Sequence, residues 1–315
     1  MAYVEQAEAP YTGADGPELL TTQEALKLLY LAYRAVRTRG RRLGFVRVQF
    51  VAANAGDGTS SIARDFALVA ADQVFNQIAK ARHMFGGETR MPFVLRTKCA
   101  IGTGYGSQHS MDPVGIFATS PGWRIAAAST PFDYVGLMNS ALACKDPVLV
   151  IEHVDLYNST GAAPVEDLDY IIPVGKAAVR RKGRELTVLT YLSMVNHSME
   201  AVDQTGIDAE VIDLRWLDRA SLDWDTIATS IKKTNNVLIV EQGARGTSYG
   251  AWLADEIQRR YFDWLDQPVQ RVTGAEASPS ISKVLERAAC ARTEEVVDGL
   301  RQVMRDKGLT NAGSI

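Results

Sequence analysis

Short apolar runs without polar alternation recur along this chain and are separated by segments with helical periodicity. Strands of a parallel sheet have this continuous apolar character when helices cover both faces of the sheet. Alternation of such strands with helices is typical of α/β proteins. The pattern predicts two open, mostly parallel sheets, with strands at residues 45–51, 93–96, 125–128, 148–151, 186–191, 210–214, 237–240 and 269–273.

Two of the predicted helices flank the strands at 93–96 and 125–128. A long helix is predicted over 61–83 from its apolar spacing. A second begins after Thr130, which is an N-cap residue followed by Pro131 and then by an acid, Asp133, in the first turn. We expect these helices to cover the first sheet.

The order of the predicted elements divides the 315 residues into two domains. Residues 1–20 are acidic, contain Pro and Gly, and are predicted to form a disordered tail. A first α/β domain is predicted over 21–157 and a second over 185–315. A polar, Pro-containing stretch at 158–184 is predicted to link them.

A Gly-rich loop after the strand at 93–96 is the strongest candidate for chemistry, and it ends in Gln108-His109-Ser110. Glycines at 102, 104 and 106 allow positive φ and a close approach to a ligand or another chain. A histidine delivered into a cleft by such a loop can move protons near neutral pH. The pattern allows equally a histidine that only forms local hydrogen bonds.

Charge and cysteine content restrict the function classes. A net charge of −3 argues against a nucleic-acid or membrane-surface role. The three cysteines, at 99, 144 and 290, lack zinc-site spacing and indicate a reducing compartment. No apolar run reaches the roughly 18 residues that span a bilayer, and the first twenty residues do not resemble a signal peptide. We therefore expect a cytoplasmic protein without a membrane partner.

Residues 53–61 follow the strand at 45–51 and have the outline of a phosphate-binding P-loop. The pattern needs Gly at 53 and Lys at 59, where this chain has Ala53 and Thr59. The stretch 21–70 resembles a degenerate P-loop region of bacterial exopolysaccharide-synthesis proteins of the tyrosine-kinase type. A structural strand and turn is favoured here over nucleotide hydrolysis.

A series of further motifs occurs in one order along the chain: 65–77, 82–87, Gln108-His109-Ser110, Pro121-Gly122, Ser129-Thr130-Pro131, 145–148, 212–215 and 272–274. From about residue 64 onward they resemble the beta subunit of thiamine-dependent 2-oxo-acid dehydrogenases, a group within the transketolase superfamily. The resemblance implies a transketolase-like pyrimidine-binding domain, atypical over 21–64, and a transketolase C-terminal domain.

The same resemblance implies an oxidoreductase subunit, most simply of the pyruvate dehydrogenase type. Its partner would be an alpha subunit in an α2β2 heterotetramer, which binds thiamine diphosphate between the two chains and Mg²⁺ on the alpha chain. The reaction would be decarboxylation of a 2-oxo acid and acyl transfer to a lipoyl transacylase core.

Site residues follow from the resemblance by position. Phe66 and Gln108 are expected at the cofactor, with Phe66 against its aminopyrimidine ring, and His109 at the substrate side as the catalytic group. Some members bind a structural K⁺ through carbonyl oxygens. The matching positions are Phe93, Ala141, Leu142, Cys144 and Asp146. An ordinary core-and-loop role for these five positions is an open alternative.

One departure bears on activity. Family members carry a glutamate before the Phe66 position, and its carboxylate activates the cofactor through the aminopyrimidine ring. Here the P-loop-like segment occupies that region, and neither Glu24 nor Asp57 has a matching context. The alternative function is therefore a non-catalytic homologue or fusion product that keeps the subunit interfaces.

Overall fold

The computed structural model describes residues 71–107, 109–164, 166–246 and 248–312, and all of them belong to one compact unit, Arg47–Ile315. The predicted tail, the P-loop-like segment and the strand at 45–51 lie outside the described residues, as do Phe66 and Gln108. None of the helices in the described part of the chain is both long enough and apolar enough to cross a membrane.

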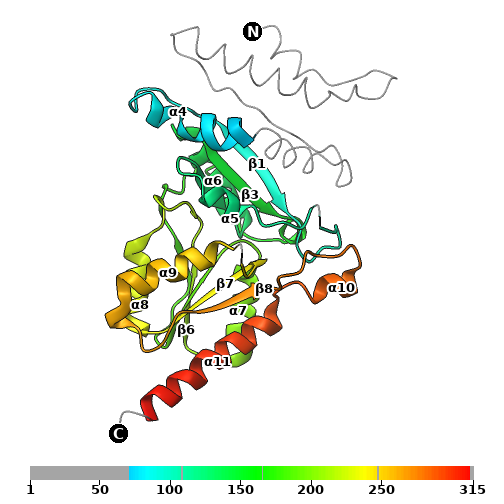
Figure 1. The fold of residues 1–315 in the computed structure, drawn as a ribbon, viewed down its shortest axis with the longest axis vertical. Coiled ribbons are helices and arrows are strands. Elements are labelled where there is room, and N and C mark those ends of the chain that lie inside the picture. The colour runs from blue at the N-terminus through cyan, green and yellow to red at the C-terminus, as the bar shows by residue number, and fades with distance from the viewer. Residues whose placement is uncertain (1–70, 108, 165, 247, 313–315) are drawn as a thin grey trace. The chain divides into compact units, whose positions relative to one another are not determined.

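The first sheet contains, among the described residues, β1 (Val94–Cys99), β2 (Arg124–Ala127) and β3 (Val148–His153) in the order β1-β3-β2 (Figure 1). All pairings are parallel. Helices α5 (Val114–Ala118) and α6 (Pro131–Ala143) follow β1 and β2. The continuous apolar runs therefore form the predicted parallel strands.

The cap predicted for α6 is confirmed. Thr130 Oγ1 accepts a hydrogen bond from the backbone N–H of Asp133 at 3.1 Å, and Pro131 occupies the first turn. Leu137 and Ala141 of the helix are buried against Val148 in one apolar cluster. The capped helix thus begins at the carboxyl end of β2 and covers one face of the sheet.

The helix predicted over 61–83 is described from residue 71, and it differs from a regular α-helix. Its first part, η1 (Asp72–Ile78), is a π-helix, and α4 (Ala79–Met84) continues it. Trp123 Nε1 donates to the backbone oxygen of Val74 at 3.0 Å from outside the helix. A competing donor of this kind disturbs the regular ladder of hydrogen bonds and accompanies a wider turn.

The second sheet has five strands in the order β4-β6-β5-β7-β8, with only β4 antiparallel. Its strands are β4 (Ala178–Arg181), β5 (Leu186–Thr190), β6 (Ala209–Asp213), β7 (Val237–Ala244) and β8 (Gln270–Gly274). The helical elements of this part are α7 (Met194–Thr205), α8 (Trp224–Thr234), α9 (Tyr249–Tyr261), η3 (Phe262–Trp264), α10 (Lys283–Arg287) and α11 (Thr293–Ala312), whereas η2 (Val154–Asn158) directly follows β3 of the first sheet.

Helices cover both faces of this sheet. One face packs on α7 and α11, whose apolar residues share a buried cluster with β5, β6, β7 and β8. On the other face, Thr187 of β5 contacts Ser230 and Thr234 of α8 through hydroxyl hydrogen bonds of 2.7 Å. The predicted fold class, two open and mostly parallel α/β sheets, is confirmed.

Strand β4 lies inside the stretch that was predicted as a linker, 158–184. Residues 178–181 form no apolar run, because β4 is an edge strand that reads Ala-Val-Arg-Arg and none of its residues is fully buried. It pairs antiparallel with β6, from Ala178 opposite Asp213. The second sheet therefore includes a strand from within 158–184.

Backbone hydrogen bonds join β2 of the first sheet to the segment that follows the carboxyl end of β6 in the second sheet. Ala127 N donates to Arg215 O at 2.8 Å, and Leu217 N donates to Ile125 O at 2.8 Å. Trp216, between these two pairs, is fully buried. The carboxyl ends of both sheets therefore face a common zone, where ligands of open α/β sheets usually bind.

Candidate functional site

The Gly-rich loop leaves β1 at its carboxyl end and closes on itself before α5. Ala100 N donates to His109 O at 3.1 Å, and the N–H groups of His109 and Ser110 both donate to Gly106 O at 3.2 Å. Glycines 102, 104 and 106 have φ values of 84°, 82° and 74°. The predicted positive-φ loop is present, and its backbone delivers His109 to the edge of the sheet.

The imidazole of His109 is half-buried and contacts an aromatic ring of the same loop. Its ring centroid lies 6.1 Å from that of Tyr105, edge to face at 78°. Lys98 Nζ in turn lies 5.7 Å from the centroid of the Tyr105 ring. A histidine held in this way combines a fixed backbone with a partly accessible ring, which suits proton transfer to a bound ligand.

Behind the loop lies a half-buried acid, Asp112, at the contact between the two sheets. Its carboxylate accepts from Val114 N at 2.9 Å and from Tyr191 Oη at 2.8 Å. Burial raises the pKa of Asp112, and these two hydrogen bonds oppose the shift. Glu241, within β7, is fully buried, and burial raises its pKa.

Two other histidines of this zone form hydrogen bonds with structural partners. His153 accepts at Nδ1 from Asp155 N at 3.2 Å, so its Nε2 donates to Gln242 Oε1 at 2.6 Å. Burial lowers the pKa of His153 and keeps the ring neutral. Burial also lowers the pKa of His197, whose Nδ1 lies 2.8 Å from the Thr293 hydroxyl.

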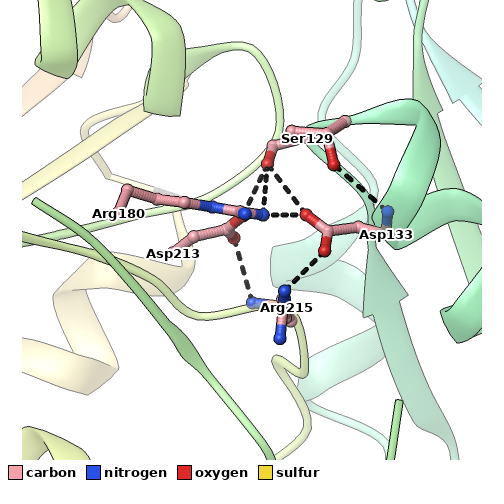
Figure 2. A network of polar contacts seen from close by, with 6 residues as sticks. Ser129, Asp133, Arg180, Asp213 and Arg215 are labelled. Atoms are coloured by element: carbon pink, nitrogen blue, oxygen red, sulfur yellow. Dashed lines mark hydrogen bonds and ion pairs between the residues drawn. The ribbon is translucent and has the colours of Figure 1, made fainter. Parts of the chain in front are cut away.

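Next to this zone, five polar residues from both domains form the network drawn in Figure 2: Ser129, Asp133, Arg180, Asp213 and Arg215. The two aspartates are fully buried. Arg180 pairs with both of them, at 2.7 Å to Asp213, and Arg215 binds Asp133 at 2.5 Å. The Ser129 hydroxyl donates to Asp213 at 2.5 Å. Each buried charge has a partner, so the network fixes how α6 sits on the second sheet.

Comparison with known proteins assigns this architecture to a family. Residues 61–160 match the pyrimidine binding domain of transketolase, and residues 175–296 match the transketolase C-terminal domain. The pyruvate dehydrogenase E1 component subunit beta of Porphyra purpurea is 36% identical over 242 residues, which are 76% of this chain and 72% of that protein. The chain belongs to the family of 2-oxo-acid dehydrogenase beta subunits.

A second relative of this beta subunit is the acetoin:2,6-dichlorophenolindophenol oxidoreductase subunit beta of Bacillus subtilis (strain 168). It is 36% identical over 248 residues, 78% of this chain and 71% of that protein. A solved structure described as a split gene transketolase, inactive beta4 tetramer, shares the fold, with a TM-score of 0.59 at 16% identity over 79% of this chain and 78% of that chain.

Several motifs that suggested the family have structural tasks in this beta subunit. Ser129-Thr130-Pro131 and the motif at 212–215 meet in the network of Figure 2. Arg82 of the motif at 82–87 forms an ion pair with Asp146 of the motif at 145–148. These residues connect elements of the fold, so the motifs to which they belong have structural tasks.

The residues predicted to bind K⁺ lie at the opposite end of the first sheet from His109. Phe93 precedes β1, Ala141 and Leu142 lie in the last turn of α6, Cys144 is its C-cap, and Asp146 precedes β3. The backbone oxygens of Phe93 and Ala141 each accept one intramolecular hydrogen bond. A carbonyl oxygen has two lone pairs, so these groups have capacity for a cation.

Side-chain metal ligands are a separate matter. Within 71–312, leaving out the undescribed positions, no three residues among His, Cys, Asp and Glu are placed to hold a metal ion. Of the other predicted site residues, His109 is described, whereas Phe66 and Gln108 lie outside the described part.

Sequence reasoning assigned no role to Asp112, Glu286 or Arg292, which contact or support the loop. Their partners are distant in the chain: Glu286 bonds to Gly102, 184 positions away. The only signal in the sequence was an acid next to an apolar pair, Val284-Leu285-Glu286, which is a weak sign of a buried carboxylate.

Proposed function

We propose that this chain is the beta subunit of a thiamine diphosphate-dependent 2-oxo-acid dehydrogenase of the pyruvate type. With an alpha chain it decarboxylates a 2-oxo acid and transfers the acyl group to a lipoyl transacylase. The observation that carries the proposal is His109, half-buried on a fixed loop at the carboxyl edge of the first sheet, in a chain of this family.

Thiamine diphosphate, when bound, supplies the carbon nucleophile for decarboxylation. The described residues suit it in one respect: a half-buried imidazole and the Tyr105 ring occupy the edge where open α/β sheets bind ligands. We assign Phe66 and Gln108 to the cofactor by their family positions. The diphosphate and its Mg²⁺ are assigned to the alpha chain.

His109 is assigned to proton transfer on the substrate side, or to contact with the lipoyl group. Its backbone N–H and C=O both form hydrogen bonds within the loop, which fixes the position from which the imidazole projects. General acid–base catalysis by a positioned histidine is worth roughly 10²–10⁴-fold in rate.

The assembly proposed is an α2β2 heterotetramer in the cytoplasm, docked on a transacylase core. The second domain is assigned to docking on the alpha chain or on that core. Exposed aromatic side chains support this assignment: Phe262 is 68% and Trp264 is 45% accessible. A carbonyl-bound K⁺ at Phe93, Ala141, Leu142, Cys144 and Asp146 is proposed to stabilise the first domain.

Co-expression with a candidate alpha chain tests the proposal. The two chains are expected to co-purify, to bind thiamine diphosphate in calorimetry, and to release CO₂ from a 2-oxo acid. Co-purification without cofactor-dependent CO₂ release would overturn the catalytic assignment. A fall in melting temperature when Na⁺ replaces K⁺ is the matching test of the cation site.

The second candidate is a non-catalytic homologue that keeps the interfaces. It is favoured by the N-terminal segment, where no glutamate matches the cofactor-activating one and where the family match begins only at residue 61. This candidate predicts an assembly that binds the alpha chain but releases no CO₂, so the same co-expression separates the two.

A further inference from the structure

A buried carboxylate from the second domain lies beneath the Gly-rich loop. Glu286, in α10, is 1% accessible. Its Oε1 accepts from Gly102 N at 2.9 Å, and its Oε2 accepts from Gly104 N at 2.6 Å. The Ser110 hydroxyl, next to His109, lies 3.3 Å from Oε1 and 3.3 Å from the backbone oxygen of Ala100, and its proton is shared between these two acceptors. One side chain thus binds both ends of the loop.

The conformation of the loop explains why an acid fits here. Gly102 and Gly104 have φ values of 84° and 82°, and this backbone turns two amides toward one side. Successive amides arranged in this way form a concave anion-binding site. The sequence suggested that such a loop could receive an external ligand; in the structure its amides already bind a carboxylate of the same chain.

Neighbouring residues of the second domain hold the loop from outside. Arg292 donates to Gly102 O at 2.8 Å, and the Ser107 hydroxyl donates to Pro279 O at 2.9 Å. A Cβ placed on Gly104 would lie 3.0 Å from the Lys283 side chain. The stretch 279–292 therefore packs directly on the loop and leaves little space for a second loop conformation.

From this geometry we infer that Glu286 is a positioning residue for His109, an inference that rests on the proposed function. Glu286 bonds to Ser110 directly, and Ser110 and His109 both donate to Gly106 O. The carboxylate therefore fixes the backbone from which the imidazole projects. Through it, the second domain sets the geometry of a catalytic group in the first.

Three variants of the full chain test the inference: Glu286→Gln, Glu286→Ala and Glu286→Asp. Glutamine keeps the size but turns an NH₂ group toward one of the loop amides, whereas aspartate keeps both acceptor oxygens on a shorter stem. Glu210→Gln is the matched control, because Glu210 is 6% accessible and pairs with Lys233 near the amino end of the second sheet.

The first readout is amide hydrogen exchange of a peptide covering residues 100–110, which does not depend on activity. We expect Glu286→Gln and Glu286→Ala to exchange there about tenfold faster than the parent or more, since the amides lose a buried acceptor. Aspartate should restore part of the protection, and Glu210→Gln should leave it unchanged. If Glu286→Ala does not fold, Glu286→Gln decides alone.

The second readout is steady-state kinetics of the co-purified alpha–beta assembly. A displaced imidazole should lower kcat by about tenfold or more with a small change in KM, and aspartate should recover part of kcat. Unchanged loop exchange, unchanged kcat in an active assembly, or an equal effect of Glu210→Gln would overturn the inference. An inactive parent assembly would refute the proposed function instead, and the exchange data would still decide on Glu286.

Discussion

The two ends of the first sheet each hold a carboxylate but bind it differently. At the amino end, Asp146 forms ion pairs with Arg82 and Arg124, whose side chains are 40% and 26% accessible. At the carboxyl end, Glu286 is almost fully buried and is bound by the amides of the Gly-rich loop. Partly exposed ion pairs contribute little and are replaceable, whereas a buried carboxylate with fixed donors defines one conformation.

This difference between exposed ion pairs and a buried carboxylate matches the different tasks that we assign to the two ends of the sheet. The amino end only has to hold strands and helices together, and Arg124 has a second acid there, Asp218, at 3.3 Å. Under the proposed function the carboxyl end presents His109 in one place, and it is built from buried polar groups of both domains. We therefore expect substitutions at the carboxyl end to cost more than equivalent ones at the amino end.

The largest expected effect is that of Asp133→Ala in the network of Figure 2, on the carboxyl side. Asp133 is fully buried and forms ion pairs with Arg180 and Arg215. Without it, Arg215 loses its ion-pair partner among the described residues, and Arg180 keeps Asp213. Removing one partner of a buried ion pair costs about 3–5 kcal/mol. Urea unfolding measures the loss. A cost below that of Asp146→Ala would contradict the comparison of the two ends.

A smaller loss of stability is expected for Gly104→Ala in the Gly-rich loop. The φ of 82° at this position is unfavourable for a residue with a Cβ, and the strain costs roughly 1–2 kcal/mol. Thermal unfolding of the full chain measures it. Gly308→Ala is the control, because Gly308 is exposed in α11 with no atom near an added Cβ. If Gly308→Ala lowers the stability as much as Gly104→Ala, backbone strain at Gly104 is not the cause of the loss.

Asp146→Ala at the amino end should cost about 1 kcal/mol or less. Arg82 would return to water, and Arg124 would keep Asp218 and the Ser221 hydroxyl, at 2.7 Å, as partners. Urea unfolding of Asp146→Ala and Asp133→Ala side by side compares the two losses of stability within one domain. Exchange of the 100–110 loop should be unchanged in this variant, because the two sites lie at opposite ends of the sheet.

The smallest expected effect is that of His153→Gln on the pH dependence of stability. Burial lowers the pKa of His153, so the unfolded chain takes up a proton at a higher pH than the folded one. The stability contributed by the neutral ring is present above the unfolded pKa of about 6.5 and is lost as pH falls toward the folded pKa. His153→Gln should therefore reduce the difference in urea midpoint between about pH 7.5 and 5.5.

The control for this pH effect is His83→Gln, since His83 is exposed at the end of α4. It should keep the pH dependence of the parent. If the urea midpoint changes with pH by the same amount in His153→Gln and in the parent, the buried imidazole is not the source of the pH dependence.

Much of the fold could be predicted, because strands covered on both faces are continuous apolar runs. The strand at 148–151 and the cap at Thr130 are examples. Strand β4 was missed because an edge strand carries arginines and no apolar run. Helices α5 and α10 were missed because five residues are too few for a helical period.

The site was predictable only in its local part. The loop and His109 are contiguous in the sequence, so glycine spacing and a terminal histidine were enough to identify them. Glu286 and Asp112 depend on contacts between the two domains, which periodicity does not encode. The π-helix at η1 likewise coincides with a contact that is distant in the sequence, the Trp123 hydrogen bond to Val74.

The central claim is that His109 acts in the reaction of a 2-oxo-acid dehydrogenase beta subunit. It is tested most directly by the rate of acyl transfer from a 2-oxo acid to a lipoyl substrate, in the co-purified alpha–beta assembly, for the parent and for His109→Gln. We predict an assembled variant whose rate is at least about 100-fold below that of the parent. Equal rates in the two assemblies would contradict the claim.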